Sequence, residues 1–246
     1  MARGAHGPPP GDRGLAGVTD PAAVAVRLAD VRRRVEQAGG DPDGIRIVAV
    51  TKGFDAEAVR AVRAAGIRDV GENYAQELLA KAPAAPEGTK WHFLGHIQRN
   101  KVGRIAGTVS VWHGVDRPEA AERVAAAAPG AEVMVQVNVL GDPKRSGCAA
   151  SEVDDLVSYV RTLPLDLSGL MAVGPASSGD ASRDCFRWLA RRAGQLGLRE
   201  LSMGMSDDFE MAVAEGATTI RLGRVLFGPR PEPGGQGEIG LETGGI

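Results

Sequence analysis

Cysteine is scarce in this sequence, with only Cys148 and Cys185 among 246 residues. The two lie far apart and neither belongs to a CxxC pair, so the sequence favours neither a disulfide framework nor a cysteine zinc site. No apolar run approaches the length of a membrane span, and the first residues lack the apolar core of a signal peptide. We therefore expect two reduced thiols in a cytoplasmic protein that does not enter a membrane.

An excess of one charge is also missing, since 29 basic and 31 acidic residues leave a formal net charge of -2. Such a balance creates no global field that would recruit nucleic acid or an anionic membrane. Nucleotide fingerprints are absent as well, because no GxGxxG follows the first predicted strand and no GxxxxGK[ST] occurs. The sequence therefore predicts local recognition of a ligand, with no nucleic-acid partner.

The two ends of the chain have no periodic apolar pattern. Residues 1–19 are rich in Gly, Pro and Arg, and residues 231–246 have the sequence PEPGGQGEIGLETGGI. Segments of this composition cannot bury enough apolar surface to fold. We expect a disordered leader (1–19), one folded domain (20–230) and a disordered tail (231–246).

Between these ends, strand-like and helix-like patterns alternate. Asp20 and Pro21 are a helix-start signal, and the apolar residues after them recur at helical spacing until Gly39 and Gly40. Apolar runs typical of buried strands then alternate with helical segments, one of which is expected to start with a capping box at Ser151 and Asp154. The eight predicted strands are 45–52, 67–72, 90–95, 109–115, 131–139, 165–173, 198–204 and 218–223.

Each of the first seven strands is followed by a helical segment, without a break in composition. This pattern predicts an α/β fold, a single (β/α)8 TIM barrel with an extra N-terminal helix. An open doubly wound sheet is the alternative. In a barrel, the residues that come directly after the strands lie together at the end where active sites form.

Lys52 is the candidate reactive residue, because it directly follows the apolar strand IRIVAVT. A lysine against an apolar wall loses hydration of its ammonium form, so its pKa falls and its neutral amine can attack a carbonyl. Lys52 is therefore a candidate Schiff-base lysine. The alternative is a solvated lysine that begins a loop.

The last two strand ends suggest an anion site. Barrels often bind phosphate with the loops after strands seven and eight. Here Ser206 is expected to cap the next helix and donate its hydroxyl, and Gly223 lets the backbone approach an anion. Asp207 and Asp208 would repel a phosphate unless they face away. The alternative is that Ser206 is only a helix cap and Gly223 only a turn residue.

His92 and His96 are four residues apart, the spacing of a metal-ligand pair on a helix. The surrounding KWHFLG is instead typical of a strand, and Gly95 interrupts helical geometry. We predict no metal site, and we expect both residues to be neutral, hydrogen-bonded histidines of the barrel.

Four motifs together resemble the pyridoxal phosphate homeostasis proteins, single-domain relatives of the N-terminal barrel of alanine racemase. They are AVTKGF at 49–54, VGENYAQE at 70–77, WHFLGHIQRNKV at 91–102 and the long segment 201–228, LSMGMSDDFEMAVAEGATTIRLGRVLFG. The resemblance covers nearly all of the expected domain and implies pyridoxal 5'-phosphate as the cofactor. It implies a site in which Lys52 forms the internal aldimine, Asn73 lines the pocket, Ser206 and the backbone of Gly223 and Arg224 cradle the phosphate, and Arg221 faces the pyridine nitrogen.

The resemblance also implies a function. A protein of this kind holds the cofactor on Lys52, limits the free aldehyde and supplies apo-enzymes, without catalysis of its own. We expect no racemisation because the second acid or base comes from another domain in racemases. Two alternatives are an amino-acid racemase built on this barrel and an aldolase that forms its Schiff base with the substrate. Arg145 departs from the family, which has a lysine at this place that could form imines.

Overall fold

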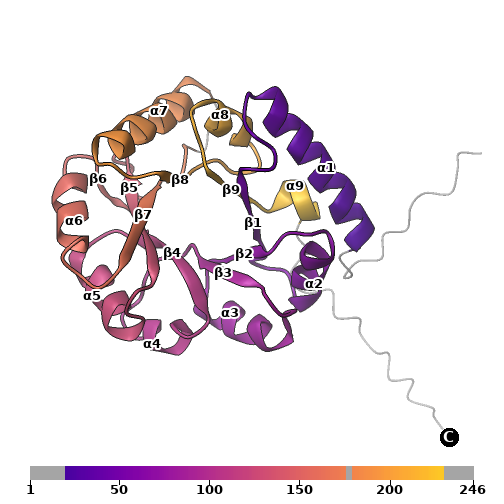
Figure 1. The fold of residues 1–246 in the computed structure, drawn as a ribbon, viewed down its shortest axis with the longest axis horizontal. Coiled ribbons are helices and arrows are strands. Elements are labelled where there is room, and N and C mark those ends of the chain that lie inside the picture. Colours follow the sequence, from indigo (N-terminus) through magenta and orange to yellow (C-terminus); the bar gives the residue numbers. More distant parts are fainter. Residues whose placement is uncertain (1–19, 176–178, 230–246) are drawn as a thin grey trace, which may run out of the picture.

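The computed structural model describes residues 20–175 and 179–229. The leader and tail expected at 1–19 and 231–246 lie outside these residues, as does position 230. The described chain is a closed barrel of parallel strands surrounded by helices, with α1 (Pro21–Gln37) as an additional helix before the first strand (Figure 1). The predicted (β/α)8 TIM barrel with an extra N-terminal helix is therefore confirmed.

The eight barrel strands are paired in parallel in the order β4-β3-β2-β1-β9-β8-β7-β5, and β4 pairs with β5 to close the ring. A ninth strand, β6, pairs only with β5 and comes after it along the chain. The barrel strands are β1 (Arg46–Val50), β2 (Asp69–Glu72), β3 (Lys90–Phe93), β4 (Val109–Val115), β5 (Glu132–Asn138), β7 (Asp166–Met171), β8 (Glu200–Ser202) and β9 (Thr219–Leu222), and β6 is Cys148–Ala149.

The helices cover the outside of the barrel (Figure 1). Two helices begin with an aspartate cap: at the predicted start of α1, Asp20 accepts from the N–H groups of Ala22 and Ala23, and directly before residue 56, Asp55 accepts from the N–H of Glu57. The helices after α1 are α2 (Ala56–Ala64), α3 (Ala75–Lys81), η1 (Ala82–Ala84), α4 (Val102–Ile105), α5 (Pro118–Ala127), α6 (Val153–Val160), α7 (Asp180–Gln195), α8 (Phe209–Ala214) and α9 (Arg224–Phe227).

Three local predictions are wrong or incomplete. The capping box at Ser151 and Asp154 does not form, because α6 begins one residue later and Glu152 is its N-cap, with its side chain on the N–H of Ala149. The strand β6 and the four-residue helix α9 were not expected. Both are too short for a periodic signal, so contacts with the rest of the barrel determine them.

The inside of the barrel contains an unusual share of polar groups. A small apolar cluster of Val111, Met134 and Met171 lies apart from the main core, which fills the space between strands and helices. TIM barrels mostly fill their interior with branched apolar residues. Here the buried polar side chains include His92, His113, Ser202 and Arg221 on strands β3, β4, β8 and β9.

Candidate functional site

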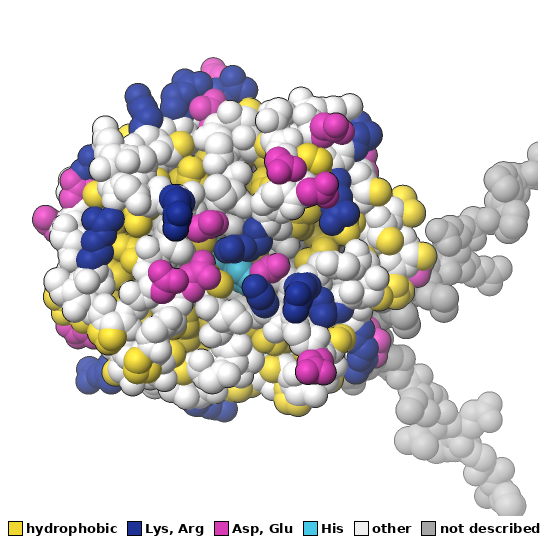
Figure 2. All heavy atoms as spheres, viewed as in Figure 1, with side chains coloured by type: hydrophobic (Ala, Val, Ile, Leu, Met, Phe, Trp, Pro, Cys, Tyr) yellow, Lys and Arg dark blue, Asp and Glu magenta, His cyan; other side chains and the backbone are white. Residues whose placement is uncertain are grey.

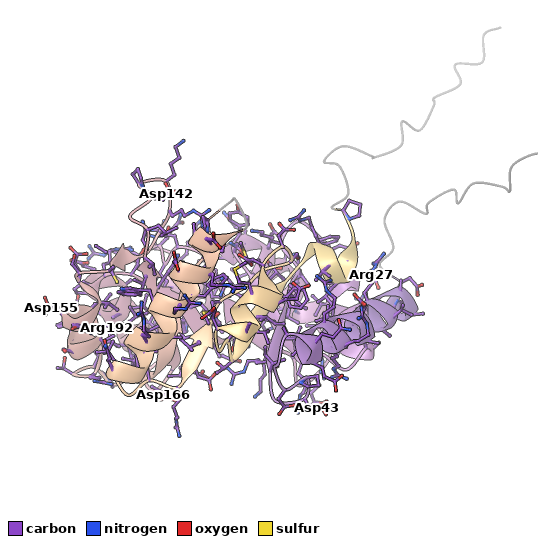
Figure 3. The ribbon with its side chains drawn as sticks, turned by 90° about the horizontal axis from the view of Figure 1, so that it is seen from above. Arg27, Asp43, Asp142, Asp155, Asp166 and Arg192 are labelled. Atoms are coloured by element: carbon purple, nitrogen blue, oxygen red, sulfur yellow. The ribbon has the colours of Figure 1, made fainter. Side chains whose placement is uncertain are left out.

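All six predicted site residues line one cavity of about 360 Å³ at the end of the barrel where the strands end. In Figure 3 this end carries the loop of Asp142, while Asp43 and Asp166 lie at the opposite end, where strands begin. The lining contains Lys52, Asn73, Ser206, Arg221, Gly223 and Arg224 together with Val50, Phe54, Leu94, Met171, Val173, Met205 and Asp207.

Lys52 lies in the turn after β1, between two residues whose backbone is held in place. Lys81 Nζ donates to the carbonyl of Thr51 at 2.7 Å, and the N–H of Gly53 donates to Glu77 Oε2 at 2.8 Å. Gly53 has a φ of 76°, a conformation that favours glycine. The turn therefore presents Lys52 at the cavity from a fixed backbone.

A buried ion pair between Lys81 and Glu72 lies next to the turn that contains Lys52. Lys81 Nζ lies 2.7 Å from Glu72 Oε1 and 2.8 Å from Glu77 Oε2, and the Thr51 hydroxyl donates to Glu72 Oε1 at 2.6 Å. Burial raises the pKa of the Glu72 carboxyl, and the hydrogen bonds from Lys81 and Thr51 oppose this effect. This network was not predicted, although the acid at the end of the strand IRDVGE was a signal.

Arg221 is a buried cation beside the cavity, 5% exposed. Its Nη1 donates to Ser202 Oγ at 2.7 Å and its Nη2 donates to the carbonyl of Ala172 at 2.8 Å. Burial lowers the pKa of its guanidinium to about 10, and the nearby Asp208 carboxylate opposes the shift. A guanidinium with this pKa stays protonated at neutral pH, so it can donate hydrogen bonds and cannot accept them.

Ser206 caps a different helix from the one that we predicted. The N-cap of α8 is Asp208, whereas Ser206 Oγ accepts from the N–H of Val225 at 3.3 Å, in the first turn of α9. The first N–H groups of a helix have no partner within the helix. The hydroxyl of Ser206 and the N–H groups after Gly223 therefore lie together at the cavity.

The two acids next to Ser206 are both engaged. Asp208 is buried, its Oδ1 accepts from the N–H of Met205 at 2.6 Å, and burial raises the pKa of its carboxyl. Asp207 is exposed and forms an ion pair with Arg224, which is exposed as well. Asp207 lines the cavity, so Arg224 partly neutralises the acid that would repel an anion.

Asn73 lines both this cavity and a neighbouring one of about 200 Å³. The backbone approach there is close, because a Cβ on Gly95 would lie 1.9 Å from the carbonyl oxygen of Asn73. Arg145 lines the second cavity and donates to the carbonyls of Val173 and Gly174. It therefore braces the loop after β7.

The two candidate histidines differ in their surroundings. His92 is fully buried inside the barrel and hydrogen-bonded, as predicted for its position and its hydrogen bonds, but His96 has a side chain that is 47% exposed and lies 3.4 Å from Asp116 Oδ2. The prediction is wrong for His96 because that residue lies beyond the end of β3 and leaves the barrel wall. Across residues 20–175 and 179–229, we find no cluster of three or more His, Cys, Asp or Glu side chains suited to a metal ion.

Both cysteines are free and buried, and burial raises the pKa of Cys148 to about 12 and that of Cys185 to about 11. Thiols with such pKa values are poor nucleophiles at neutral pH. Among the described helices, none has the length and apolar character needed to cross a membrane.

Comparison with known proteins shows which family this chain is similar to. The family model described as alanine racemase, N-terminal domain, matches residues 20–231. A protein of Pseudomonas aeruginosa named pyridoxal phosphate homeostasis protein is 44% identical over 216 residues, which cover 84% of this chain and 94% of that protein.

Solved structures show the same fold. PipY of Synechococcus elongatus, in a structure titled as having PLP bound, matches with a TM-score of 0.73 and 33% identity over 83% of this chain and all of that one. The alanine racemase of Corynebacterium glutamicum matches with a TM-score of 0.66 and 17% identity over 88% of this chain and 63% of the racemase. The second likeness concerns the fold alone.

Proposed function

This chain belongs to the alanine racemase N-terminal domain family, among the pyridoxal phosphate homeostasis proteins, and we propose that it binds pyridoxal 5'-phosphate covalently through Lys52 and takes part in intracellular homeostasis of that cofactor. The observation that carries the proposal is the single cavity in which a lysine, a buried arginine and a helix start meet. These groups match three of the functional groups of the cofactor: its aldehyde, its pyridine nitrogen and its phosphate.

Lys52 is the group that holds the aldehyde. Its cavity is partly apolar, with Val50, Leu94 and Val173 in the lining. Lys52 would hold the cofactor through its aldehyde group, whose carbonyl oxygen would leave as water. The hydrogen bonds on Thr51 and Gly53 hold the backbone on both sides of Lys52, so less backbone entropy is lost when the bond forms.

Ser206 and the start of α9 are the groups that hold the phosphate. Backbone N–H groups at Gly223 and Arg224, the Ser206 hydroxyl and the Arg224 side chain supply donors for a dianion. Gly223 has open space for this role, because a Cβ there would meet no protein atom closer than 3.5 Å. The protein itself therefore does not require glycine at this position.

Arg221 is the group that meets the ring nitrogen. The cofactor supplies an electron sink to the amino acids that it binds, and this sink is strong when the ring nitrogen is protonated. A protonated arginine donates a hydrogen bond to that nitrogen and cannot give it a carboxylate partner. This residue therefore favours storage of the cofactor over catalysis with it.

The proposed role is accordingly non-catalytic, with delivery of the cofactor to apo-enzymes as its outcome. An amino-acid racemase is the second candidate, because this chain shares its fold with the racemase barrel. An aldolase would use Lys52 without the phosphate groups. Cofactor retention after gel filtration separates the aldolase from the other two, and turnover of amino acids separates those two from each other.

Replacement of Ser206 by alanine is expected to weaken cofactor binding by about 1 to 3 kcal/mol, since a charged acceptor then lacks one hydrogen bond. Dissociation constants from absorbance titrations of apoprotein measure the effect, and inorganic phosphate should compete with the cofactor. Ser151, an exposed serine, provides the matched control Ser151→Ala. Equal affinity in the two variants would show that Ser206 is a helix cap and nothing more.

We expect the loaded protein to exchange the α-proton of L-alanine in deuterated water no faster than free pyridoxal phosphate does. The reason is Arg221, which leaves the ring nitrogen unprotonated and the barrier to proton loss high. Deuterium incorporation and D-alanine formation are measured together. Racemisation with a kcat of about 1 per second or more would favour the racemase instead.

A further inference from the structure

Five buried or partly buried side chains form a continuous chain of hydrogen bonds through the barrel. Arg221 Nη1 contacts Ser202 Oγ at 2.7 Å, and Ser202 Oγ lies 2.9 Å from His113 Nδ1. His113 Nε2 lies 2.9 Å from His92 Nδ1, and His92 Nε2 lies 2.9 Å from Asp69 Oδ1. The chain uses strands β9, β8, β4, β3 and β2, so it crosses the interior from the cavity to the start of β2.

When both histidines are neutral, the two end groups of the chain, Arg221 and the Asp69 carboxylate, set the direction of every bond between them. Arginine can only donate, so Ser202 Oγ accepts from Arg221 and its own hydroxyl hydrogen is available for His113 Nδ1. His113 Nδ1 is then unprotonated, which puts the proton of the neutral ring on Nε2. That proton goes to His92 Nδ1, and His92 in turn donates its Nε2 proton to the Asp69 carboxylate. With both histidines neutral, all four bonds have one donor and one acceptor.

A second protonation state fits less well. If His113 were protonated, its Nδ1–H would point at an oxygen that already accepts from Arg221, and its charge would face that of the guanidinium. Burial, with the nearby positive charges of Arg221 and Arg46, holds the pKa of His113 well below its usual value. The geometry and the electrostatics therefore select the same arrangement.

A hydrogen-bonded polar interior of this kind brings no gain in stability over an apolar one, so a role other than stability is indicated. Buried polar groups weaken a protein unless each is hydrogen-bonded, and most barrels avoid them with apolar residues. His92, His113 and Ser202 are all fully buried, in the part of the interior where branched apolar side chains would pack. At the end of this chain of hydrogen bonds, the Arg221 guanidinium donates one hydrogen bond to the Ser202 side chain and one to the backbone carbonyl of Ala172.

We propose that Asp69, His92, His113 and Ser202 are positioning residues that orient Arg221 at the cofactor site through a one-directional hydrogen-bond relay. The relay starts at Asp69, whose side chain is 22% exposed at the opposite end of the barrel. The part of the inference that concerns the cofactor rests on the proposed function, whereas the orientation of Arg221 does not.

The starting end of the relay lies among charges of both signs. Figure 2 looks onto this end of the barrel and shows Lys, Arg, Asp and Glu side chains around a histidine near the middle. Arg46 and Lys90 are the cations that, with His92, favour the charged form of Asp69, and the pKa of its carboxyl is lowered although burial acts in the opposite direction. Arg46 also faces Glu132 and Glu200 across the barrel, at 3.6 and 3.9 Å. An ionised Asp69 is thus the fixed acceptor that sets the direction of the relay.

The first test uses the apoprotein, so it does not depend on cofactor binding. Nitrogen-15 spectra of the histidine rings at neutral pH should show His92 and His113 as neutral rings with the proton on Nε2. A proton on Nδ1 of His113 would overturn the relay.

The second test acts at a distance. Asp69→Asn should shift the Arg221 side-chain nitrogen signals, although Asp69 has its described hydrogen bond only with His92 and lies four hydrogen bonds from Arg221. The matched control is Asp166→Asn, which changes an exposed acid at the same end of the barrel (Figure 3) and should leave the Arg221 signals in place. Arg221 signals that stay unchanged in Asp69→Asn would show that the residues are packed side by side without coupling.

The third test includes the cofactor. Ser202→Ala should weaken cofactor retention by about tenfold, the loss expected for one hydrogen bond to a charged group, and should shift the absorbance maximum of the bound form. Ser202→Thr keeps the hydroxyl and should restore the maximum. Cofactor binding with an unchanged spectrum in Ser202→Ala would overturn the relay alone, while intact histidine signals in a wild-type protein that binds no cofactor would overturn the proposed function alone.

Discussion

Lys52→Ala is expected to abolish the absorbance band that sodium borohydride removes from the wild-type protein. The wild type should purify yellow, because an imine of the cofactor absorbs near the edge of the visible range. Borohydride reduces that bond and fixes the cofactor on the chain, so mass spectrometry of peptides from the reduced protein should place the added mass on Lys52. In Lys52→Ala, no added mass is expected.

The size of this effect depends on the difference between covalent and noncovalent binding. The phosphate and ring contacts are unchanged in Lys52→Ala, so the variant should still bind the cofactor reversibly. A lysine on the exposed surface lies away from the cavity that would hold the phosphate and the ring, whereas Lys52 lines that cavity. Dialysis should therefore remove the cofactor from the variant and leave it on the wild type.

Lys144→Ala is the matched control, because Lys144 is an exposed lysine at the same end of the barrel, in the loop of Asp142. It should keep the band, the reducible bond and the retention of the wild type. A reducible bond in stoichiometric amount in Lys52→Ala would mean that Lys52 is the wrong lysine. A colourless wild type that takes up no added cofactor would refute the proposed function as a whole.

The position of Lys52 could be predicted from the sequence because it depends on a local pattern. A short β-branched run between a helix that ends at glycine and an aspartate cap is typical of a buried strand. Strand β1 is found within the predicted range 45–52. Repetition of the same pattern then indicated the barrel. Residues that come directly after the strands of a barrel lie at one end of it, so the six candidate residues could be grouped before any contact was known.

The bonds that these residues form could not be predicted in the same way. Ser206 was expected to cap α8, the next helix along the chain, but it caps α9, where its partner Val225 lies nineteen residues further on. The relay has the same character, since Ser202 and His113 are 89 residues apart and meet only when the barrel closes. Alternation along β4 indicates that His113 points the same way as Val111, but no pattern in the neighbouring sequence identifies the residue with which His113 forms a hydrogen bond.

Lys81→Met is expected to lower the free energy of unfolding by about 3–5 kcal/mol, the usual result when one member of a buried ion pair is removed. Glu72 is fully buried, and its Oε2 already lacks a hydrogen-bond partner among the described residues. Without Lys81, only the Thr51 hydroxyl would remain on its other oxygen. Urea unfolding at neutral pH measures the loss, and Lys144→Met, at an exposed lysine, is the control with little expected change.

The deficit of Lys81→Met should shrink as the pH falls. Burial already raises the pKa of Glu72 in the folded protein, and removal of the nearby cation raises it further. A carboxyl whose folded pKa lies above its unfolded value, about 4.3 for glutamate, contributes most below that unfolded value and loses its contribution as the pH rises. The free energy of unfolding of the variant should therefore approach that of the wild type as the pH falls to the unfolded pKa of about 4.3, and should differ most from it at neutral pH.

The double variant Glu72→Gln with Lys81→Met separates the charge from the position of the turn. It should regain most of the stability, because no uncompensated charge stays buried. It should still form the covalent bond with the cofactor more slowly than the wild type, since the carbonyl of Thr51 has lost its Lys81 donor next to Lys52. A double variant as unstable as Lys81→Met would show that packing of the long lysine chain, and not its charge, holds this part of the barrel.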